Sequence, residues 1–425
     1  MSKTKVFRNT AIALAVAGPL TAAMATNGYF SHGYGMKAKG MGGAAVASTD
    51  SAFAGANNPA AAAWAGNRME IGLDLFMPTP RGMERTGSGI DASVESGSTS
   101  FWVPEFGYNR ALSDKLGVGL TVYGNGGLNT DYGFGQVTCG GPTNNVLCGV
   151  GKLGIDMMQL VIAPTVAYKV SDAHSFGISP LIVHQQFKAD GLQGFAGLSS
   201  DNTKLTNNGY DSSNGVGVRL GYLGKMSDKL TIGASYSPKI KMSKLSEYSG
   251  LFADDGNFDI PENYTVGMSF QATPAVRVAL DYTTIKYSGV PSVGNPSTNL
   301  AAPLGDANGP GFGWSDIDVW KLGVEWQQSG NLTLRAGLNV GDNPIQSRDV
   351  TFNILAPGVV TTHYTLGGTY ALSKESELTV AYMYAPKQSV SGTSLFDTLM
   401  GPGAGGTETI SMGQQSIGVQ YGWKF

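Results

Sequence analysis

Charged residues are scarce in this chain of 425 residues. Lysine, arginine, aspartate and glutamate together make up 14% of it, whereas about 25% is usual for a soluble globular protein. Long apolar runs are missing as well, because no segment after the N-terminus reaches the roughly 18 consecutive apolar residues of a membrane-spanning helix. The composition therefore argues against both an ordinary soluble domain and a helical membrane protein.

Cysteine and histidine are also rare. The two cysteines, Cys139 and Cys148, bound the segment "CGGPTNNVLC", and in an exported protein such a close pair predicts a disulfide that closes a loop. A zinc site would need further ligands nearby, and the sequence offers none. We therefore expect no metal and no cofactor.

No catalytic motif surrounds any of the four histidines, which are spread over the chain. A surface hydrolase would place a serine or aspartate beside a histidine on neighbouring strands. His184 and His363 leave such a lipid-acting enzyme open as an alternative. Our expectation is that the protein is not an enzyme.

The first 25 residues have the pattern of a secretory signal peptide. Lys3, Lys5 and Arg8 precede the apolar stretch 11–20, and Ala23-Met24-Ala25 provides a small-residue cleavage site. A membrane anchor is the alternative, but the apolar stretch is short for one. Cleavage would make a chain of net charge −3 more acidic, which argues against a nucleic-acid partner.

From residue 68 to residue 425 the sequence alternates between apolar and polar positions in segments of about 9–12 residues, as expected for strands with two different faces. The final segment "QSIGVQYGWKF" shows the pattern most clearly, with Ile417, Val419, Tyr421, Trp423 and Phe425 at every second position. Six short polar turns join strands in pairs, and one strand remains at each end. The segments 189–213, 288–314 and 389–412 are long and irregular.

This pattern predicts an all-β transmembrane barrel of 14 antiparallel strands. In hydrocarbon every backbone N–H and C=O group must be paired, so a spanning sheet has to close on itself. The alternation of short turns and long loops is typical of outer-membrane barrels, as are tyrosine and tryptophan at strand ends. A secreted β-sandwich is the alternative, but its apolar face would be packed against a second layer.

Residues 26–67 do not alternate and are rich in small residues. A 14-stranded barrel is too wide for its own side chains to fill, so we expect this segment to fold into a plug, or hatch, in the lumen. The stretch Ala60–Ala63, which follows Asn58-Pro59, fits a short helix with Pro59 in its first turn. A flexible periplasmic tail is the alternative.

The N-terminal "GYGMKAKGMGGAAVASTDSAFAGANNPAAAA" resembles the hatch of the FadL-type outer membrane transporters of long-chain fatty acids and hydrocarbons. The segments 104–132, 260–288 and 332–345 and the aromatic terminus extend the resemblance over the mature chain. It implies passive import of hydrophobic molecules across a Gram-negative outer membrane. The substrate would enter a groove between external loops, pass a pocket beside the hatch, and leave sideways through the wall.

The resemblance implies that the lateral exit lies at a kinked third strand. The matching strand here is 116–127, and its residues Gly124, Asn125, Gly126 and Gly127 break the alternation. Glycine within a strand weakens pairing and marks bulges or bends. The alternative is that these four residues simply begin a loop.

Two long loops are unexpectedly apolar. They supply the candidate capture residues Leu192, Phe195, Leu198, Leu251 and Phe252. Exposed apolar side chains at this density indicate a binding partner, although the two loops could instead pack on each other.

Strand parity directs several charged side chains into the lumen. A structural ion network that anchors the hatch is the simpler interpretation. The sharper one is that Arg219, Lys321 or Arg335 meets a fatty-acid carboxylate.

The expected partners are hydrophobic small molecules, outer-membrane lipid and lipopolysaccharide. The terminal Phe425 also resembles the signal by which the barrel assembly machinery recognises its substrates. We expect a monomer. The sequence does not decide between fatty acids and aromatic or alkane hydrocarbons as cargo.

Overall fold

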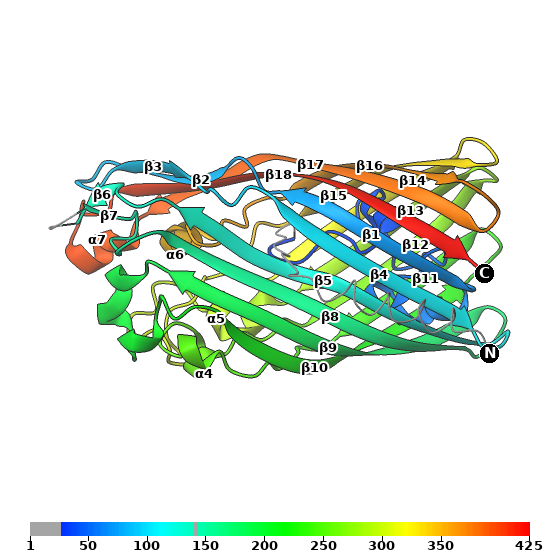
Figure 1. Cartoon of the computed structure of the whole chain (residues 1–425), viewed down its shortest axis with the longest axis horizontal. Helices are drawn as coiled ribbons and strands as arrows, with labels where there is room; N and C mark the ends of the chain where they lie inside the picture. The colour runs from blue at the N-terminus through cyan, green and yellow to red at the C-terminus, as the bar shows by residue number, and fades with distance from the viewer. Residues whose placement is uncertain (1–26, 140–142) are drawn as a thin grey trace, which may run out of the picture.

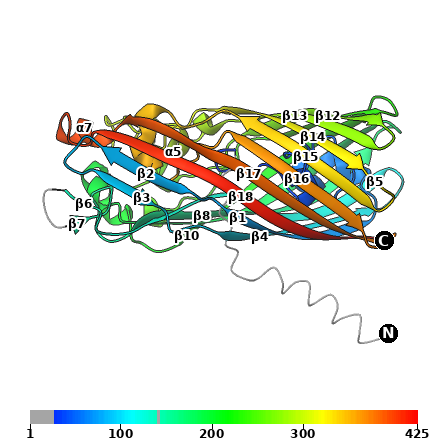
Figure 2. The ribbon, with the colours of Figure 1, turned by 90° about the horizontal axis from the view of Figure 1, so that it is seen from above.

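The computed structural model describes residues 27–139 and 143–425, so the predicted signal peptide lies outside the described residues. Fourteen antiparallel strands form a closed barrel, because β1 pairs with β18 as well as with β4. Figures 1 and 2 show the strands tilted around an elongated barrel. The barrel strands are β1 (Arg68–Met77), β4 (Phe101–Ala111), β5 (Leu116–Tyr132), β8 (Leu153–Lys169), β9 (His174–Asp190), β10 (Asp211–Lys225), β11 (Leu230–Ser237), β12 (Asn263–Thr273), β13 (Val276–Ile285), β14 (Ile317–Gln327), β15 (Leu332–Gly341), β16 (Thr362–Ala371), β17 (Ser376–Thr393) and β18 (Thr407–Lys424).

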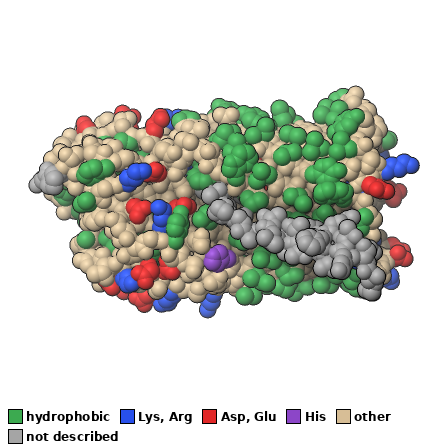
Figure 3. Space-filling view, viewed as in Figure 1, with side chains coloured by type: hydrophobic (Ala, Val, Ile, Leu, Met, Phe, Trp, Pro, Cys, Tyr) green, Lys and Arg blue, Asp and Glu red, His purple; other side chains and the backbone are tan. Residues whose placement is uncertain are grey.

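The two faces of each strand differ as the alternation predicts. In β18, Ile417 and Val419 are 49% and 45% exposed, whereas Gln420, which follows Val419 and faces the lumen, is 1% exposed. Figure 3 shows outward hydrophobic side chains gathered over the half of the barrel nearer the C-terminus, with charged side chains toward the two ends. The apolar outer face is therefore the surface that meets lipid.

The six short turns lie where the sequence places them, between β4 and β5, β8 and β9, β10 and β11, β12 and β13, β14 and β15, and β16 and β17. The prediction of a long loop over residues 389–412 is wrong in its extent, because the loop is shorter. β17 continues to Thr393 and β18 begins at Thr407, and the two remain paired along this extension. A further hairpin, β2 (Arg81–Thr86) and β3 (Ala92–Glu95), pairs with the extended part of β18.

The other elements are short. Within the described parts of the chain, no helix is long and apolar enough to span a bilayer. In the N-terminal segment, residues 27–66, are α2 (Met36–Lys39), α3 (Ala54–Asn57) and the 3-10 helix η1 (Pro59–Ala63). The loops hold η2 (Gln193–Leu198), η3 (Asn202–Lys204), η4 (Ser246–Tyr248), α4 (Ala253–Gly256), η5 (Tyr287–Gly289), α5 (Pro291–Gly294), η6 (Ser347–Asp349), α6 (Val350–Asn353) and α7 (Leu395–Met400).

Cys139 and Cys148 are joined by a disulfide beside the small hairpin of β6 (Val137–Thr138) and β7 (Thr143–Asn144). The loop they close is short, so its loss should cost only about 2–3 kcal/mol of local stability. We expect Cys139→Ser/Cys148→Ser to leave the barrel folded but to make this loop the first site of proteolysis. Limited proteolysis with mass spectrometry tests this, and an unchanged cleavage pattern would contradict it.

Candidate functional site

The N-terminal segment packs against lumen-side residues of the barrel wall. Every residue from Asn27 to Ala47 is buried, and lumen-side glycines of the wall allow the close approach. A Cβ atom added at Gly117 of β5 would lie 2.1 Å from the carbonyl oxygen of Ala62, and one at Gly233 of β11 would lie 2.2 Å from that of Val46. Glycines on the wall therefore let the backbone of the segment approach closely.

Buried ion pairs hold α2 against the wall. Lys39 Nζ lies 2.8 Å from Asp74 Oδ2 on β1 and 2.9 Å from Glu105 Oε1 on β4, and all three side chains are at most 2% exposed. Burial alone would lower the pKa of Lys39, but the two carboxylates outweigh burial and raise it. Lys37 in turn binds Glu70 of β1 and Glu377 of β17. Removing Lys39 would leave Asp74 and Glu105 buried without a cation. Without Lys37, by contrast, Glu70 and Glu377 would keep Arg68 and Lys424 as partners.

Asn58 is the polar anchor of η1. Its Oδ1 accepts a hydrogen bond from the Ala60 amide at 3.1 Å, which caps the helix. Its Nδ2 donates to the carbonyl oxygens of Val46 at 2.7 Å and Tyr222 at 2.8 Å. Pro59 opens η1 and Ala60 is fully buried. The residues Asn58, Pro59 and Ala60 thus tie the segment to itself and to β10.

The third barrel strand, β5, carries a bulge at Asn125. Its register with β8 shifts between Gly124 and Gly126, so one extra residue is inserted there. The strand nevertheless continues through Gly127 to Tyr132. The interpretation that Gly124, Asn125, Gly126 and Gly127 merely begin a loop is therefore wrong.

The other edge of β5 loses its neighbour at the same level. Pairing with β4 ends at Phe106 and Val122, and beyond this point the N-terminal segment takes the place of β4. Ser31 donates its amide to the Asn125 carbonyl oxygen at 3.2 Å, and Gly127 donates its amide to that of Tyr29 at 3.3 Å. The barrel wall therefore has an interruption between β4 and β5, and the N-terminal segment occupies it.

Side chains secure the same junction. Asn125 Nδ2 donates to Gln159 Oε1 on β8 at 3.0 Å, and the Tyr34 hydroxyl donates to Asn125 Oδ1 at 3.2 Å. The Tyr287 hydroxyl accepts from the Tyr29 amide and donates to the Asn27 carbonyl oxygen. The bulge is thus hydrogen-bonded to both the wall and the N-terminal segment.

An apolar pocket lies where the long loops meet. It is a cavity of about 40 Å³. Four of the predicted capture residues, Leu192, Phe195, Leu251 and Phe252, line it, whereas Leu198 packs at the edge of the core beside it. The two loops therefore pack on each other and also leave a hollow. The remaining lining residues are Ile155, Phe187, Ser292, Leu304, Pro310, Gly311, Phe312, Phe352 and Leu355.

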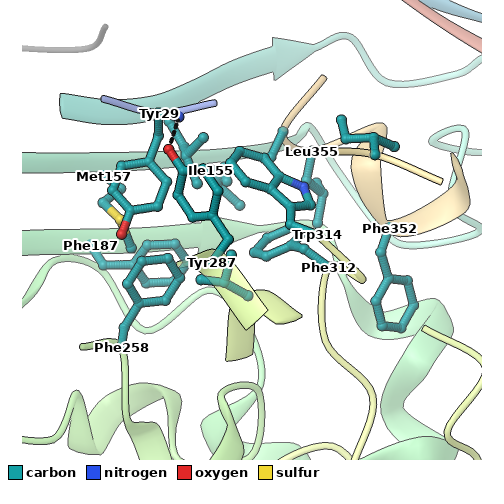
Figure 4. Close-up of a cluster of buried hydrophobic side chains, with 14 of the residues drawn as sticks. Tyr29, Ile155, Met157, Phe187, Phe258, Tyr287, Phe312, Trp314, Phe352 and Leu355 are labelled. Atoms are coloured by element: carbon teal, nitrogen blue, oxygen red, sulfur yellow. Dashed lines mark hydrogen bonds between the residues drawn. The ribbon is translucent and has the colours of Figure 1, made fainter. Parts of the chain in front are cut away.

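A cluster of buried aromatic rings connects this pocket with the junction at β5 (Figure 4). Phe312 of the pocket has its ring centroid 6.4 Å from that of Trp314, which lies 5.1 Å from Tyr287 and 6.0 Å from Tyr29. Tyr29 is the residue whose carbonyl oxygen pairs with Gly127 of β5. Apolar packing is thus continuous from the pocket to the interruption in the wall.

The three predicted lumen cations have different surroundings. Arg219 donates to the carbonyl oxygens of Gly55 and Ala56 and to the Tyr123 hydroxyl. Arg335 pairs with Glu325 at 2.7 Å and donates to Thr369. Lys321, opposite Asp281 in the β13–β14 pair, is 9% exposed and lines a second, polar cavity of about 60 Å³. Among the described residues it has no ion-pair partner.

Several residues of the site were missed from sequence. Lys37, Lys39 and Glu105 lie in segments whose charges carry no spacing signal, and Phe312 and Trp314 sit in a loop that looks merely glycine-rich. In the part of the chain that the structure describes, no three potential metal ligands lie together. His32 and His363 stack with centroids 6.0 Å apart but have no serine or carboxylate partner among their hydrogen bonds.

Comparisons with known proteins agree with this architecture. The family model described as outer membrane protein transport protein (OMPP1/FadL/TodX) matches residues 12–425. The long-chain fatty acid transport protein of Escherichia coli K12 is 24% identical over 92% of this chain and 94% of its own, and that of Salmonella typhi is equally similar.

Among solved structures, the Pseudomonas putida toluene transporter TodX superposes with a TM-score of 0.66 at 21% identity, over 93% of this chain and 99% of its own. A Pseudomonas aeruginosa FadL homologue gives a TM-score of 0.67 at 14% identity, over 94% and 100% of the two chains. The structural likeness supports the barrel fold, and the family match covers nearly the whole sequence. The chain therefore belongs to the OMPP1/FadL/TodX family of outer membrane transport proteins of Gram-negative bacteria.

Proposed function

We propose that the protein passively imports hydrophobic small molecules, either fatty acids or aromatic and alkane hydrocarbons. The observation that carries the proposal is the continuous apolar packing from the loop pocket to the interruption beside β5. A water-filled channel would give such molecules no advantage, whereas an apolar, largely preformed pocket suits them. A hydrophobic solute leaving at membrane depth would enter lipid directly.

The proposed route has three stages. The cargo is captured in the apolar pocket, moves along the aromatic cluster, and leaves between β4 and β5 at Gly124–Gly127. Residues 26–67 act as the hatch, which blocks the aqueous lumen and whose residues 29–31 must withdraw from β5 to open the exit. The disengagement would break the backbone bonds from the Ser31 amide to Asn125 and from the Gly127 amide to Tyr29.

The outer surfaces of the barrel indicate its partners. The outward apolar faces meet outer-membrane lipid, and the loops at the far end of the barrel meet lipopolysaccharide. Phe425, 60% exposed at the end of β18, is available to the barrel assembly machinery. We propose that the protein acts as a monomer, since the pocket and the exit are both built from one chain. An enzymatic role gains no support from the surroundings of His184 or His363.

Uptake by cells tests the proposal. Cells lacking the protein should take up labelled toluene or oleate more slowly, and the wild-type gene should restore the rate. Leu251→Glu places a charge in the apolar pocket, where burying it is costly, so this variant should fail to restore uptake. Leu251→Met keeps the pocket apolar and should restore it. Equal uptake with and without the protein, for every apolar compound tried, would refute import.

A further inference from the structure

We propose that the apolar pocket selects uncharged, compact hydrocarbons and rejects carboxylates, an inference that rests on the proposed import function. The thirteen residues that line the pocket include no charged side chain. Five of them are phenylalanines, Phe187, Phe195, Phe252, Phe312 and Phe352. An ionised carboxylate placed there would lose its hydration and find no cation to replace it.

The one polar side chain in the lining is already fully engaged. Ser292 Oγ accepts a hydrogen bond from the Ala253 amide at 2.9 Å and donates its proton to the Asn257 carbonyl oxygen at 2.5 Å. Its single O–H is therefore unavailable to a ligand. A carboxylate in this pocket could be stabilised only by breaking a bond that organises the loop, so the pocket offers it no compensation.

The lumen cation that could meet a carboxylate lies in a different compartment. Lys321 lines the polar cavity, which shares no lining residue with the apolar pocket. Buried rings join the two, from Phe312 through Trp314 and Tyr287 to Phe30, each at most 8% exposed. With its tail in the apolar pocket, a fatty acid therefore has no cation within the lining to meet its carboxylate.

Size and shape point the same way. The cavity is small, about 40 Å³, whereas an apolar cavity that binds benzene measures about 150 Å³, so any ligand must push the surrounding rings apart. Phe187 and Phe252 meet edge to face with centroids 4.6 Å apart, and so do Phe195 and Phe352 at 5.2 Å. A small ring can insert among such edges and faces with modest rearrangement, whereas a long alkyl chain would require the whole cluster to separate.

A matched pair of brominated ligands tests the proposal. Crystals of the full-length mature protein are soaked at equal concentration with 4-bromotoluene or with 4-bromobenzoate at pH 8, and the bromine is located by anomalous scattering. We expect bromine in the apolar pocket with 4-bromotoluene only. Bromine in this pocket with the benzoate, or the absence of 4-bromotoluene from it, would overturn the inference. Bromotoluene found there in crystals but with no competition in uptake would count as binding at crystal concentration only and would also overturn it.

Uptake measurements separate this inference from the import function. With wild-type protein, excess 4-bromotoluene should compete strongly with labelled toluene, and 4-bromobenzoate at least about tenfold less well, because burial of an unpaired charge costs well over 1.4 kcal/mol. Lys374→Met, in an exposed turn, should leave toluene uptake unchanged. If carboxylates compete as well as hydrocarbons, the selectivity is refuted while import stands. Absence of any protein-dependent uptake would instead refute import itself.

Discussion

Replacing Lys39 by methionine is expected to release the N-terminal segment from the barrel wall and to make the lumen conduct ions. The substitution leaves Asp74 and Glu105 buried without their cation, and breaking a buried pair in this way costs roughly 3–5 kcal/mol. The barrel itself should survive, since its backbone pairing does not involve Lys39. Single-protein conductance in planar bilayers measures the opening, and heat-modifiable migration in gels confirms that the barrel remains folded.

Two matched variants sharpen this prediction. Lys374→Met removes a lysine from an exposed turn and should conduct no more than the wild type. The triple variant Lys39→Met/Asp74→Asn/Glu105→Gln removes the stranded charges too, and should recover part of the closure, because a neutral set is less costly to bury than unpaired carboxylates. If Lys39→Met alone remains as closed as the wild type, the ion pairs do not hold the segment in place.

Deleting Asn125 is expected to abolish import while leaving the barrel intact. The deletion removes the inserted residue, so the register of β5 with β8 would run unbroken through this region. Without the bulge, the part of β5 after Val122 would lose the conformation that separates it from β4 and lets it bind residues 29–31. Toluene uptake should fall to the level of cells lacking the protein. Deletion is cleaner than a valine at Gly126, where a Cβ atom would lie 1.8 Å from the Tyr29 carbonyl oxygen.

The matched control for this deletion is Asn125→Ala. It keeps the bulged residue but removes the hydrogen bonds to Gln159 and Tyr34, so it should retain most of the uptake. A deletion variant that folds and still imports at the wild-type rate would place the exit elsewhere. An alanine variant as defective as the deletion would assign the effect to the asparagine side chain rather than to the bulge.

The barrel was predictable because its physical constraint is strong and local. In a strand between lipid and lumen, apolar and polar side chains must alternate. Segments such as "QSIGVQYGWKF" show this alternation on their own, so the strand can be recognised without knowing its neighbours. The glycine-rich stretch at 124–127 likewise marked an irregularity in the third strand. The sequence could not predict which segment would pair with the free edge of β5, because this depends on where residues 29–31 lie in the folded structure.

The site was harder to predict for the same reason. Loop residues Leu192, Phe195, Leu251 and Phe252 stood out by their hydrophobicity, but Phe312 and Trp314 joined them only through the path of a separate loop. Parity placed Arg219 and Arg335 in the lumen, yet it gave no sign of the backbone carbonyls and the Glu325 that engage them. The extension of β17 and β18 was missed because its sequence resembles a polar loop.

The fit between the N-terminal segment and the glycines of the wall also constrains how the molecule is assembled. The segment precedes β1, and the seam that encloses it forms only when β1 pairs with the last strand, β18. The clearance is so small that Gly42 could not carry even a methyl group without approaching Leu338 of β15 to 2.8 Å. The N-terminal segment could not be threaded through such narrow gaps into a barrel that had already closed. The start of the chain must therefore already be folded in place, or wrapped as the sheet curls, when its end arrives to close the ring.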